Sequence, residues 1–472
     1  MGDGRKETAF GGRLMLLGFG CIGQGVLPLL LRHIDMRPDQ ILIVKPNAVG
    51  LDLAREYGVP VHKARLVPDG FAHVLDSLLR PGDFLLNLSV DVSSVALISF
   101  CQERGVLYLD TGTEPWAGGY VDVECATARR TNYALREAAL ALRRPQRAGP
   151  TALLTHGANP GLVSHFVKQA LLDICADSGA EVEPPRVRKE WARLAQKMQV
   201  RTVHIAERDT QVGTQRKHLN EFVNTWSVIG FVGEGLQPAE LGWGSHERHF
   251  PVDAGRHESG SRASIYLQRP GASTRVRSWT PLGGPMHGFL ITHAESISIA
   301  DYLTLDDADH PIYRPTVHYA YHPCDDAVLS LHELAGRNWR MQDRSRILTD
   351  DIVSGVDELG VLLMGHTRGA YWYGSQLSVE QARAACPHNS ATSLQVTAAV
   401  MAGVVWAIRH PDRGIVEPDE LPFDEILDLC RPYLGDVVGV YSDWTPLAER
   451  GRLFPEDIDG GDPWQFKNFR VV

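Results

Sequence analysis

The chain has 472 residues, of which 44% are hydrophobic and 22% charged, and its formal net charge at pH 7 is −10. This length exceeds one ordinary core and predicts two or more domains, while the acidic balance argues against a nucleic-acid-binding protein. The 7 cysteines are scattered singly, and neither a signal peptide nor an apolar stretch of membrane-spanning length is evident, so we expect a soluble cytoplasmic protein.

The first predicted element is an apolar strand that leads directly into the glycines of Gly18-x-Gly20-x-x-Gly23. In a dinucleotide-binding turn, the first glycine makes the bend, the second lets the backbone approach a pyrophosphate, and the third allows close helix packing. A glycine triplet alone also fits a turn without function, but this one opens an apolar helix over residues 22–31. The sequence therefore predicts binding of NAD or NADP, and the predicted cofactor-binding residues of this turn are Gly18, Gly20, Cys21, Ile22 and Gly23.

The second predicted strand, residues 40–44, ends at Lys45. An NAD-binding unit usually has Asp or Glu here, because a carboxylate accepts hydrogen bonds from the adenosine ribose. Lys45 would contact the extra phosphate of NADP, or it would point to solvent while Asn47 reaches the ribose. The sequence thus leaves the choice between NAD and NADP open.

The chain to residue 144 continues as an alternation of strands and helices. Strands are predicted at residues 84–88 and 106–110, helices at 52–57, 71–79, 93–104 and 132–144, and a linker at 144–150. This is the pattern of a Rossmann-type, doubly wound parallel sheet, in which ligands bind beyond the carboxyl ends of the strands. We therefore expect a dinucleotide-binding domain over residues 1–150, completed by a helix near 393–408, and further cofactor-binding residues at the strand ends: Ser89, Asp110 and Thr111.

Residues 151–472 are predicted to form a second domain that binds the substrate. An apolar strand runs into Gly-Ala-Asn-Pro-Gly at residues 157–161 and then into a helix at 162–175. The region 201–321 is rich in Gly, Trp, His and Thr with β-type runs, which favours a largely antiparallel sheet. The fold class predicted for the whole chain is α/β plus α+β.

Trp226 lies in one of several polar clusters of this second domain, between Asn224 and Ser227. A tryptophan is most often a core residue, and the residue alone favours that interpretation. Its functional alternative is a ring face over a cation, worth about 2 kcal/mol when desolvated.

His318 and His322 superficially resemble a metal site, but Pro323 and the neighbouring aromatic residues favour extended structure and hydrogen-bonded structural roles, so we expect no metal.

An ordered set of motifs over nearly the whole chain resembles the bacterial homospermidine synthases, which belong to the saccharopine dehydrogenase-like superfamily. Long segments such as Asn-Thr-Trp-Ser are far more specific than the glycine triplet, and Lys45 is the departure, because the family pattern has an acid there. The matching segments are Gly18-x-Gly20-x-x-Gly23 and residues 87–91, 114–116, 157–161, 204–211, 224–228, 234–244, 293–298, 357–360 and 454–458.

The resemblance implies a homodimeric transferase of polyamine biosynthesis. Two putrescines, or spermidine plus putrescine, would be condensed to homospermidine, with release of ammonia or 1,3-diaminopropane. A hydride would leave the amine-bearing carbon for a tightly bound NAD and later return to the new imine. This chemistry requires anionic or aromatic partners for ammonium and iminium groups, and a proton acceptor for the amines.

The resemblance also assigns roles to residues. Trp226 would stabilise the cation with its ring face, and three acids would bind or deprotonate substrate amines: Glu207, Glu234 and Asp91. Three further acids would line the pocket: Glu114, Glu295 and Asp357. Asn159 and His293 would orient the cofactor amide or the substrate, so Asn159 counts among both the catalytic and the cofactor-binding residues. Each acid taken alone is more often a surface charge, and the sequence does not separate the general base from a counter-ion.

Two other functions remain open at this point. A saccharopine- or carboxynorspermidine-type reductase also reduces an imine beside a nicotinamide, but its carboxylate-bearing substrates need positioned arginines. A catalytically silent dinucleotide-binding protein would have no need of Trp226, Glu207 and Glu234 together.

Overall fold

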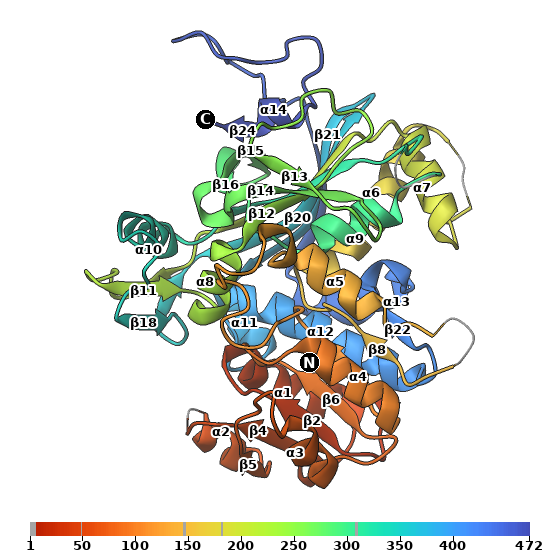
Figure 1. The fold of residues 1–472 in the computed structure, drawn as a ribbon, viewed down its shortest axis with the longest axis vertical. Coiled ribbons are helices and arrows are strands. Elements are labelled where there is room, and N and C mark those ends of the chain that lie inside the picture. Colours follow the sequence, from red (N-terminus) through yellow and green to blue (C-terminus); the bar gives the residue numbers. More distant parts are fainter. Residues whose placement is uncertain (1–5, 49, 145–147, 181–182, 307–309) are drawn as a thin grey trace.

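The computed structural model describes residues 6–48, 50–144, 148–180, 183–306 and 310–472. Two large β-sheets divide the molecule into a lower lobe, which contains the parallel sheet, and an upper lobe, which contains a mixed sheet (Figure 1). The carboxyl ends of the lower strands and the lower face of the upper sheet meet at the junction of the lobes, so the fold directs the candidate residues of both domains toward one region.

The lower sheet has seven strands in the spatial order β22–β8–β7–β6–β2–β4–β5, and all neighbours in it are parallel. β2 is buried at all four residues, as an apolar strand covered on both faces should be. It lies between β4 and β6, which makes its carboxyl end the topological switch point where ligands of such folds bind. The strands are β2 (Leu14–Leu17), β4 (Ile41–Lys45), β5 (Val61–Lys63), β6 (Phe84–Asn87), β7 (Leu107–Asp110), β8 (Ala152–Leu153) and β22 (Ile415–Val416).

Helices cover both faces of this sheet, which confirms the predicted doubly wound, Rossmann-type fold. One face packs against α1 and α12 and the other against α3 and α4. The helices of the lower lobe are α1 (Cys21–His33), α2 (Leu51–Glu56), α3 (Phe71–Leu78), α4 (Ser94–Arg104), α5 (Asn132–Leu140), α12 (Ala391–Arg409) and α13 (Phe423–Cys430).

Two short strands of this sheet come from later in the chain than residue 150. β8 pairs with β7, and β22 pairs with β8 at the edge of the sheet. α12 packs against α1, and its first residue follows Ser390, whose hydroxyl caps the helix by accepting from the Ser393 N–H. The lower lobe is therefore assembled from two separated parts of the chain. The predicted linker at 144–150 falls partly on residues 145–147, which lie outside the described residues.

α12 corrects the expectation that the chain has no apolar stretch of membrane-spanning length. Among the described residues it is the one helix long and apolar enough to cross a membrane, with 19 residues and a mean hydropathy of 1.6. However, 89% of that apolar window is buried inside the protein. Its apolar composition is accounted for by packing between α1 and the sheets.

The upper sheet has eleven strands, eight of which follow the order β13–β14–β12–β17–β9–β20–β21–β23, while β15, β16 and β24 extend it beside β17. It is largely antiparallel, as predicted, except that β17 runs parallel to β9. Parallel neighbours need a long crossover, and the chain between these two strands supplies it. The strands are β9 (Thr202–Asp209), β12 (Pro238–Gly242), β13 (Ala254–Arg256), β14 (Ser264–Pro270), β15 (Arg275–Thr280), β16 (Gly284–Phe289), β17 (Thr316–His322), β20 (Val356–His366), β21 (Gly369–Ser378), β23 (Asp436–Ser442) and β24 (Arg470–Val471).

The remaining elements lie around the two large sheets, and among them β1 and β3 pack beside α12 and α1 of the lower lobe. Three small two-stranded sheets pair β1 with β3, β10 with β19 and β11 with β18. Their strands are β1 (Thr8–Ala9), β3 (Ile34–Asp35), β10 (Val212–Gly213), β11 (Glu221–Asn224), β18 (Arg344–Ile347) and β19 (Ile352–Ser354). The helices are α6 (Leu162–Asp177), α7 (Arg188–Lys197), α8 (Val228–Leu236), α9 (Ala294–Tyr302), α10 (Asp325–Gly336), α11 (Val379–Ala385) and α14 (Phe466–Phe469).

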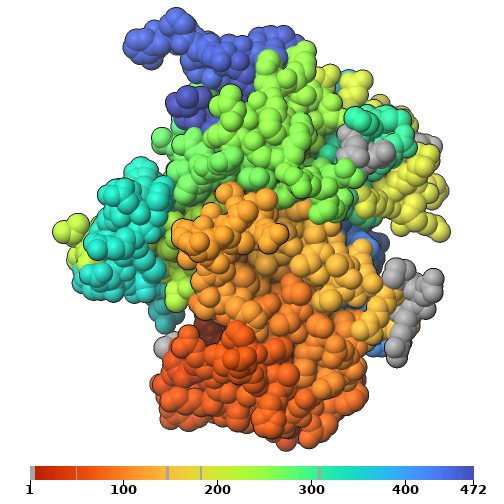
Figure 2. Space-filling view, viewed as in Figure 1, coloured from red at the N-terminus to blue at the C-terminus, as the bar shows by residue number. Residues whose placement is uncertain are grey.

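Buried ionic contacts hold the two lobes together. Arg136 of α5 is 4% exposed and donates to both carboxylate oxygens of Glu417, at 2.6 and 2.8 Å, and to Asp301 of α9 at 2.8 Å. The Glu240 carboxylate of β12 accepts the backbone N–H of Asn132 at 2.7 Å, at the start of α5, where a helix favours negative charge. The segment between β7 and α5, orange in Figure 2, lies across the junction of the lobes. These contacts fix the two domains around the site.

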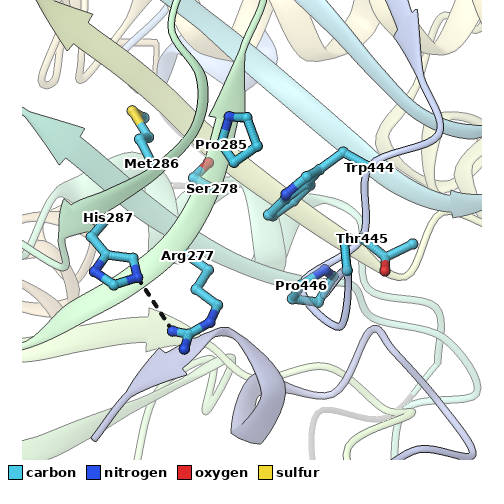
Figure 3. Close-up of a pocket in the computed structure, with 9 residues that line it drawn as sticks. Arg277, Ser278, Pro285, Met286, His287, Trp444, Thr445 and Pro446 are labelled. Atoms are coloured by element: carbon cyan, nitrogen blue, oxygen red, sulfur yellow. Dashed lines mark hydrogen bonds between the residues drawn. The ribbon is translucent and has the colours of Figure 1, made fainter. Parts of the chain in front are cut away.

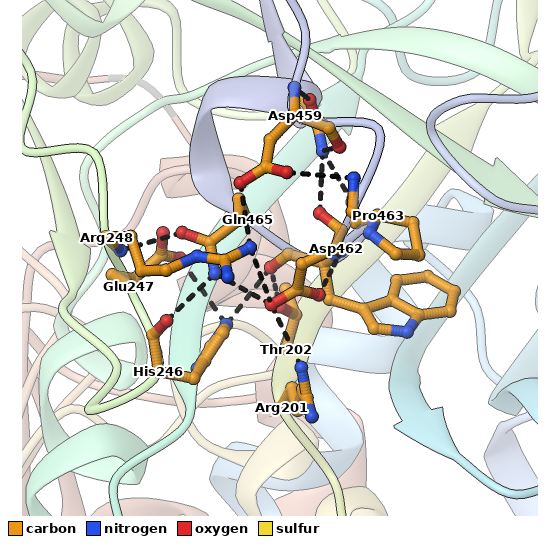
Figure 4. A network of polar contacts seen from close by, with 12 residues as sticks. Arg201, Thr202, His246, Glu247, Arg248, Asp459, Asp462, Pro463 and Gln465 are labelled. Carbon is orange, nitrogen blue, oxygen red and sulfur yellow. Dashed lines mark hydrogen bonds and ion pairs between the residues drawn. The ribbon is translucent and has the colours of Figure 1, made fainter.

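A polar network fastens the C-terminal segment to the upper sheet (Figure 4). Arg201 donates to Asp462 at 2.9 Å, and Arg248 donates to Asp459 at 2.8 Å. The buried Glu247 carboxylate accepts from the backbone N–H of Phe466 at 3.0 Å, and burial raises the pKa of Glu247 to about 7. This network stabilises α14 and does not reach the junction of the lobes.

Candidate active site

The glycine-rich turn after β2 has the geometry that a dinucleotide needs. Gly18 has φ = +89°, and a Cβ there would lie 2.7 Å from the Leu88 carbonyl oxygen. A Cβ at Gly23 would lie 3.1 Å from the Gly18 oxygen, whereas a Cβ at Gly20 would meet nothing within 4 Å. The first glycine thus makes the bend, the third permits close packing, and the second borders open space at the N-terminus of α1. Cys21 and Ile22 begin that helix, with their side chains half-buried.

Lys45 is buried beneath this turn, with 4% of its surface exposed. Its Nζ donates to the Phe19 carbonyl oxygen at 3.3 Å and lies 5.7 Å from the centre of the Phe19 ring. Burial lowers the pKa of Lys45. The alternative in which this lysine points to solvent is therefore wrong, because the side chain turns inward and supports the turn.

Asp110, at the end of β7, does not face the open space beside the turn. It is fully buried, and its two carboxylate oxygens accept from the Thr155 backbone N–H at 2.6 Å and from the Tyr108 hydroxyl at 2.8 Å. Burial raises the pKa of Asp110 to about 6. Both carboxylate oxygens are thus engaged in holding the chain after β8, and contact of Asp110 with the cofactor stays a prediction. Ser89 and Thr111 are half-buried at the neighbouring strand ends.

Glu207, on β9, lies at the centre of the upper part of the site and is 2% exposed. Its Oε2 accepts hydrogen bonds from the Tyr319 hydroxyl and from Nδ2 of Asn159, and that amide also donates to the Tyr319 oxygen at 2.6 Å. Burial raises the pKa of Glu207 to about 7, and the hydrogen bonds from Tyr319 and Asn159 act against this shift. A carboxyl group with this pKa is suited to accept a proton near neutral pH.

Two more buried acids, Asp209 and Asp357, face each other on adjacent strands. Asp209 accepts from the Thr225 hydroxyl at 2.7 Å and from the side chain of Gln211 at 3.0 Å. Asp357 accepts from the hydroxyl of Thr392, while its Oδ1 has no hydrogen-bond partner among the described residues. Burial raises the pKa of both groups. Thr392 belongs to α12, so the lower lobe contributes a hydrogen bond directly to this pair of acids.

His293 lies between two carboxylates at the start of α9. Its Nε2 is 3.0 Å from Oε2 of Glu234, and its Nδ1 is 3.3 Å from Oε1 of Glu295. Burial opposes the charged imidazolium, but the carboxylates of Glu295 and Glu234 outweigh it and raise the pKa of His293 to about 10. At neutral pH the side chain is therefore a cation compensated by its two neighbours.

Glu114 belongs to the lower lobe and lies near enough to Glu234 for the two charges to interact. Burial raises the pKa of Glu114 to about 8, and the nearby charge of Glu234 acts in the same direction. The hydrogen bonds from the Asp91 backbone and the Tyr120 side chain oppose the shift. The side chain of Asp91 is exposed, and its backbone has a positive φ of 63°. Asp91 thus lies at the outer edge of the site, whereas Glu114 lies within it.

Trp226 follows β11 and is half-buried. Its indole Nε1 donates to the Tyr321 hydroxyl at 3.2 Å, and its ring centre is 5.3 Å from that of Phe231. Tyr321 in turn stacks on Tyr319, with centres 5.1 Å apart and planes within 6°. Trp226 is therefore joined through two tyrosines to Glu207, which is not what an ordinary core tryptophan would need.

The site as a whole is rich in acids and aromatic rings. Among the described residues, the cation that pairs with these acids is His293, and no lysine or arginine forms an ion pair with them. No group of three or more His, Cys, Asp or Glu in the described part of the chain could hold a metal ion. His318 and His322 lie in β17, as the predicted extended structure requires. The acids are Asp91, Glu114, Glu207, Asp209, Glu234, Glu295 and Asp357.

Comparison with known proteins identifies the family. Two family models match, the saccharopine dehydrogenase NADP binding domain at residues 14–153 and the saccharopine dehydrogenase C-terminal domain at residues 157–440. The homospermidine synthase of Blastochloris viridis is 53% identical over 98% of this chain and 97% of its own length. That of Mesorhizobium japonicum is 49% identical, over 98% and 96%. This chain belongs to the homospermidine synthase family.

A solved homospermidine synthase has nearly the same fold. The crystal structure of the enzyme from Legionella pneumophila, in complex with NAD, is 50% identical, covers 98% of both chains and superposes with a TM-score of 0.92. The saccharopine dehydrogenase (L-Glu forming) of Saccharomyces cerevisiae, at 10% identity and a TM-score of 0.52, shares the fold alone. The resemblance predicted from the motifs is thereby confirmed.

Four residues of this candidate site were not predicted from the sequence. Asp209 is two positions from Glu207, so the alternation of side chains along a strand places both on one face and would have been a usable signal. Tyr319 and Tyr321 have the same spacing, but an aromatic residue in a strand is most often core. Thr392 reaches the site from the start of α12, and no local pattern indicates that contact.

Proposed function

We propose that this protein condenses two molecules of putrescine to homospermidine with release of ammonia. The names of its relatives and the NAD in the Legionella structure support this proposal. The observation that carries it is a cluster of acids and aromatic rings with which no described lysine or arginine pairs, beside a turn whose open second glycine fits a dinucleotide pyrophosphate. Such a cluster of acids attracts a diammonium ion and repels a carboxylate.

NAD bound at this turn would supply a hydride acceptor and donor for the amine-bearing carbon. The residues of the chain carry out the remaining work. Glu207 accepts a proton from the substrate amine, because its pKa of about 7 keeps a useful fraction ionised near neutral pH. Tyr319 and Asn159 orient the carboxylate through Oε2. Trp226 offers a ring face to the passing iminium, where it is stabilised without a bond that would trap it.

The other acids bind the ends of the diamine. Glu234 and Glu295 hold His293 in its charged form, which fixes the orientation of all three side chains. Glu114 extends this group toward the lower lobe, and Asp91 provides a negative charge at the outer edge. Asp357 has one carboxyl oxygen without a partner in the described part of the chain, and this oxygen suits an ammonium donor.

A substrate-range assay separates this function from that of a carboxylate-handling reductase. We expect putrescine to be converted with NAD, and an amino-acid semialdehyde plus a diamine and reduced cofactor to give no product above background. Conversion of the semialdehyde without conversion of putrescine would assign the protein to the saccharopine-type reductases. If neither putrescine nor the semialdehyde is converted although the cofactor is bound, the protein is a catalytically silent dinucleotide-binding protein.

Binding of putrescine should become tighter as the pH rises from about 6 to about 8.5. Over this interval Glu207 and Glu114, whose pKa values burial raises to about 7 and about 8, lose their protons. Putrescine stays charged, because alkylammonium groups titrate near 10.4, roughly as lysine does. The buried carboxylates also lower the stability of the free protein as they ionise, since their folded-state pKa values lie above those of the unfolded chain.

Thermal unfolding with and without putrescine measures this effect. The increase in Tm on adding putrescine should be larger at about pH 8.5 than at about pH 6, and Glu207→Gln should flatten the difference. An increase in Tm that shrinks with rising pH would contradict the assignment of these acids to the diamine.

Lys45→Met should weaken NAD binding by about tenfold, which corresponds to one charge-assisted hydrogen bond. Lys45 supports the turn through the Phe19 carbonyl, so its loss disturbs the backbone that receives the pyrophosphate. Lys63, its exposed neighbour at the end of β5, is the matched control. Fluorescence titration with NADH and NADPH checks the result. Loss of NADPH binding alone would instead assign Lys45 to the phosphate of NADP.

We further propose that two copies of the chain associate as a dimer through the segment that precedes α14. This segment projects from the top of the upper lobe (Figure 1) and exposes Leu453 and Phe454 at 85% and 77%. At its base is a cavity lined by Pro285, Trp444 and Pro446 (Figure 3). The cavity also contains the polar side chains of Arg277 and His287, and exposed apolar side chains beside such a mixed concave surface fit a self-complementary, two-fold contact. Light scattering should give a dimer for the wild type and a monomer for Leu453→Glu/Phe454→Glu, and a dimer in both would contradict the proposal.

A further inference from the structure

Tyr321 has no role in the proposed reaction, yet it is almost completely buried beside the site. Its side chain is 1% exposed, and its hydroxyl oxygen accepts the indole N–H of Trp226 at 3.2 Å. In the register of β17 and β9, Tyr321 is the direct neighbour of Glu207. Tyr321 thus lies between the residue that would stabilise the cation and the residue that would accept the proton.

The place of the Tyr321 hydroxyl is fixed by its surroundings. The ring stacks on Tyr319 at 5.1 Å and meets the edge of Phe231 at 5.7 Å, with an interplanar angle of 65°. β17 lies in the interior of the upper sheet, paired with β9, β12 and β16. The backbone, both neighbouring rings and the strand register therefore hold the hydroxyl in one position.

Trp226 is held less firmly by the backbone. It lies in the short connection between β11 and α8, and its side chain is half-buried. The preceding Thr225 is fastened to Asp209 at 2.7 Å. The indole ring itself rests against Phe231 at 5.3 Å, with planes tilted by 46°, and donates its N–H to Tyr321. An indole has one donor, so this hydrogen bond determines the rotation of the ring about its bond to the backbone.

We propose that Tyr321 is a positioning residue that fixes the plane of the Trp226 indole relative to Glu207. This inference rests on the proposed function. A cation is stabilised over the face of an aromatic ring and within about 6 Å of its centre, and it gains nothing at the ring edge. Tyr321 therefore keeps the ring face toward the substrate while the substrate amine is at Glu207.

The test compares Tyr321→Phe with Tyr313→Phe. Tyr313 is also a buried tyrosine whose hydroxyl has one partner, the Val200 carbonyl at 2.7 Å, and it lies outside the site. We expect Tyr321→Phe to lower kcat about tenfold with a similar KM for putrescine and unchanged NAD binding, the effect of one lost hydrogen bond. Both variants lose one hydrogen bond of a buried hydroxyl, so we expect the two to lower Tm by similar amounts. Tyr313→Phe should nevertheless leave kcat unchanged. Equal kcat for the two variants would overturn the proposal.

A double-mutant cycle separates positioning from a general effect on folding. Trp226→Phe keeps a ring face but has no N–H, so Tyr321→Phe should cost little further kcat in that background. Additive losses would overturn the proposal. If Tyr321→Phe does not fold, Trp226→Phe alone decides, because a kcat close to the wild-type value would show that the N–H is dispensable. A wild-type protein that does not convert putrescine would refute the proposed function itself and is recognised before any variant is compared.

Discussion

Trp226→Ala should lower kcat/KM for putrescine about 30-fold while Tm changes little. The factor corresponds to a cation–π interaction of about 2 kcal/mol in a desolvated site. The ring is half-buried and is joined through Tyr321 and Tyr319 to Glu207, so its removal affects the passing cation more than the core. Steady-state kinetics and thermal unfolding measured together distinguish the two effects.

Trp279 is the matched control for this substitution. It is a half-buried tryptophan on β15 that packs against the core on the far face of the upper sheet. Trp279→Ala should lower Tm and leave kcat/KM for putrescine close to that of the wild type. If Trp226→Ala instead lowers Tm as much as Trp279→Ala does and turnover falls only in proportion, Trp226 is a core residue.

Glu207→Gln should lower kcat by about 10²- to 10⁴-fold, the usual contribution of a positioned proton acceptor. Glutamine has nearly the same shape, and its Oε1 still accepts from Tyr319 and Asn159 when it takes the place of Oε2, but the side chain no longer accepts a proton. The remaining activity should also lose the rise with pH that the ionisation of Glu207 near pH 7 causes.

The same substitution should stabilise the protein, and the size of this effect depends on pH. The pKa of Glu207 is about 7 in the folded state, above the value of about 4.3 expected for an unfolded chain, so its ionisation disfavours the fold as the pH rises through this interval. Glu207→Gln should therefore raise Tm at about pH 8 and have little effect at about pH 5. Glu247, a buried acid whose pKa is also raised to about 7, lies in the C-terminal network and is the matched control, since Glu247→Gln should leave kcat unchanged. Equal kcat for both variants would remove Glu207 from the mechanism.

Much of the fold was predictable because local signals determine it. The glycine turn follows an apolar strand and precedes a helix, and the structure has that strand, turn and helix at the predicted positions. The parts that were not predictable depend on long-range contacts. The apolar strand predicted before residue 157 is β8, but no local pattern indicates that β8 and the two-residue β22 join the lower sheet. Likewise, β17 runs parallel to β9 because of a crossover whose path only the tertiary structure defines.

The candidate site shows the same division. Glu207, Glu234 and His293 were found through motifs, and the structure brings them into one region at the junction of the lobes. Asp110 was grouped with the cofactor because strand ends usually face the ligand, yet its carboxylate is used by the chain itself. The direction of the Lys45 side chain was left open, and burial under the turn decides it. A sequence indicates that a polar residue lies at a strand end, but it does not indicate which neighbouring groups will form hydrogen bonds with its side chain.

The most direct test of the account is turnover with a limiting amount of cofactor. Purified protein is incubated with putrescine and a trace of NAD, and homospermidine and ammonia are quantified by mass spectrometry and an ammonia assay. We expect homospermidine and ammonia in equal amounts and in large excess over the NAD supplied, because the hydride taken from one substrate returns to the product. Product limited to the amount of NAD, or an absence of homospermidine with the cofactor bound, would contradict the account.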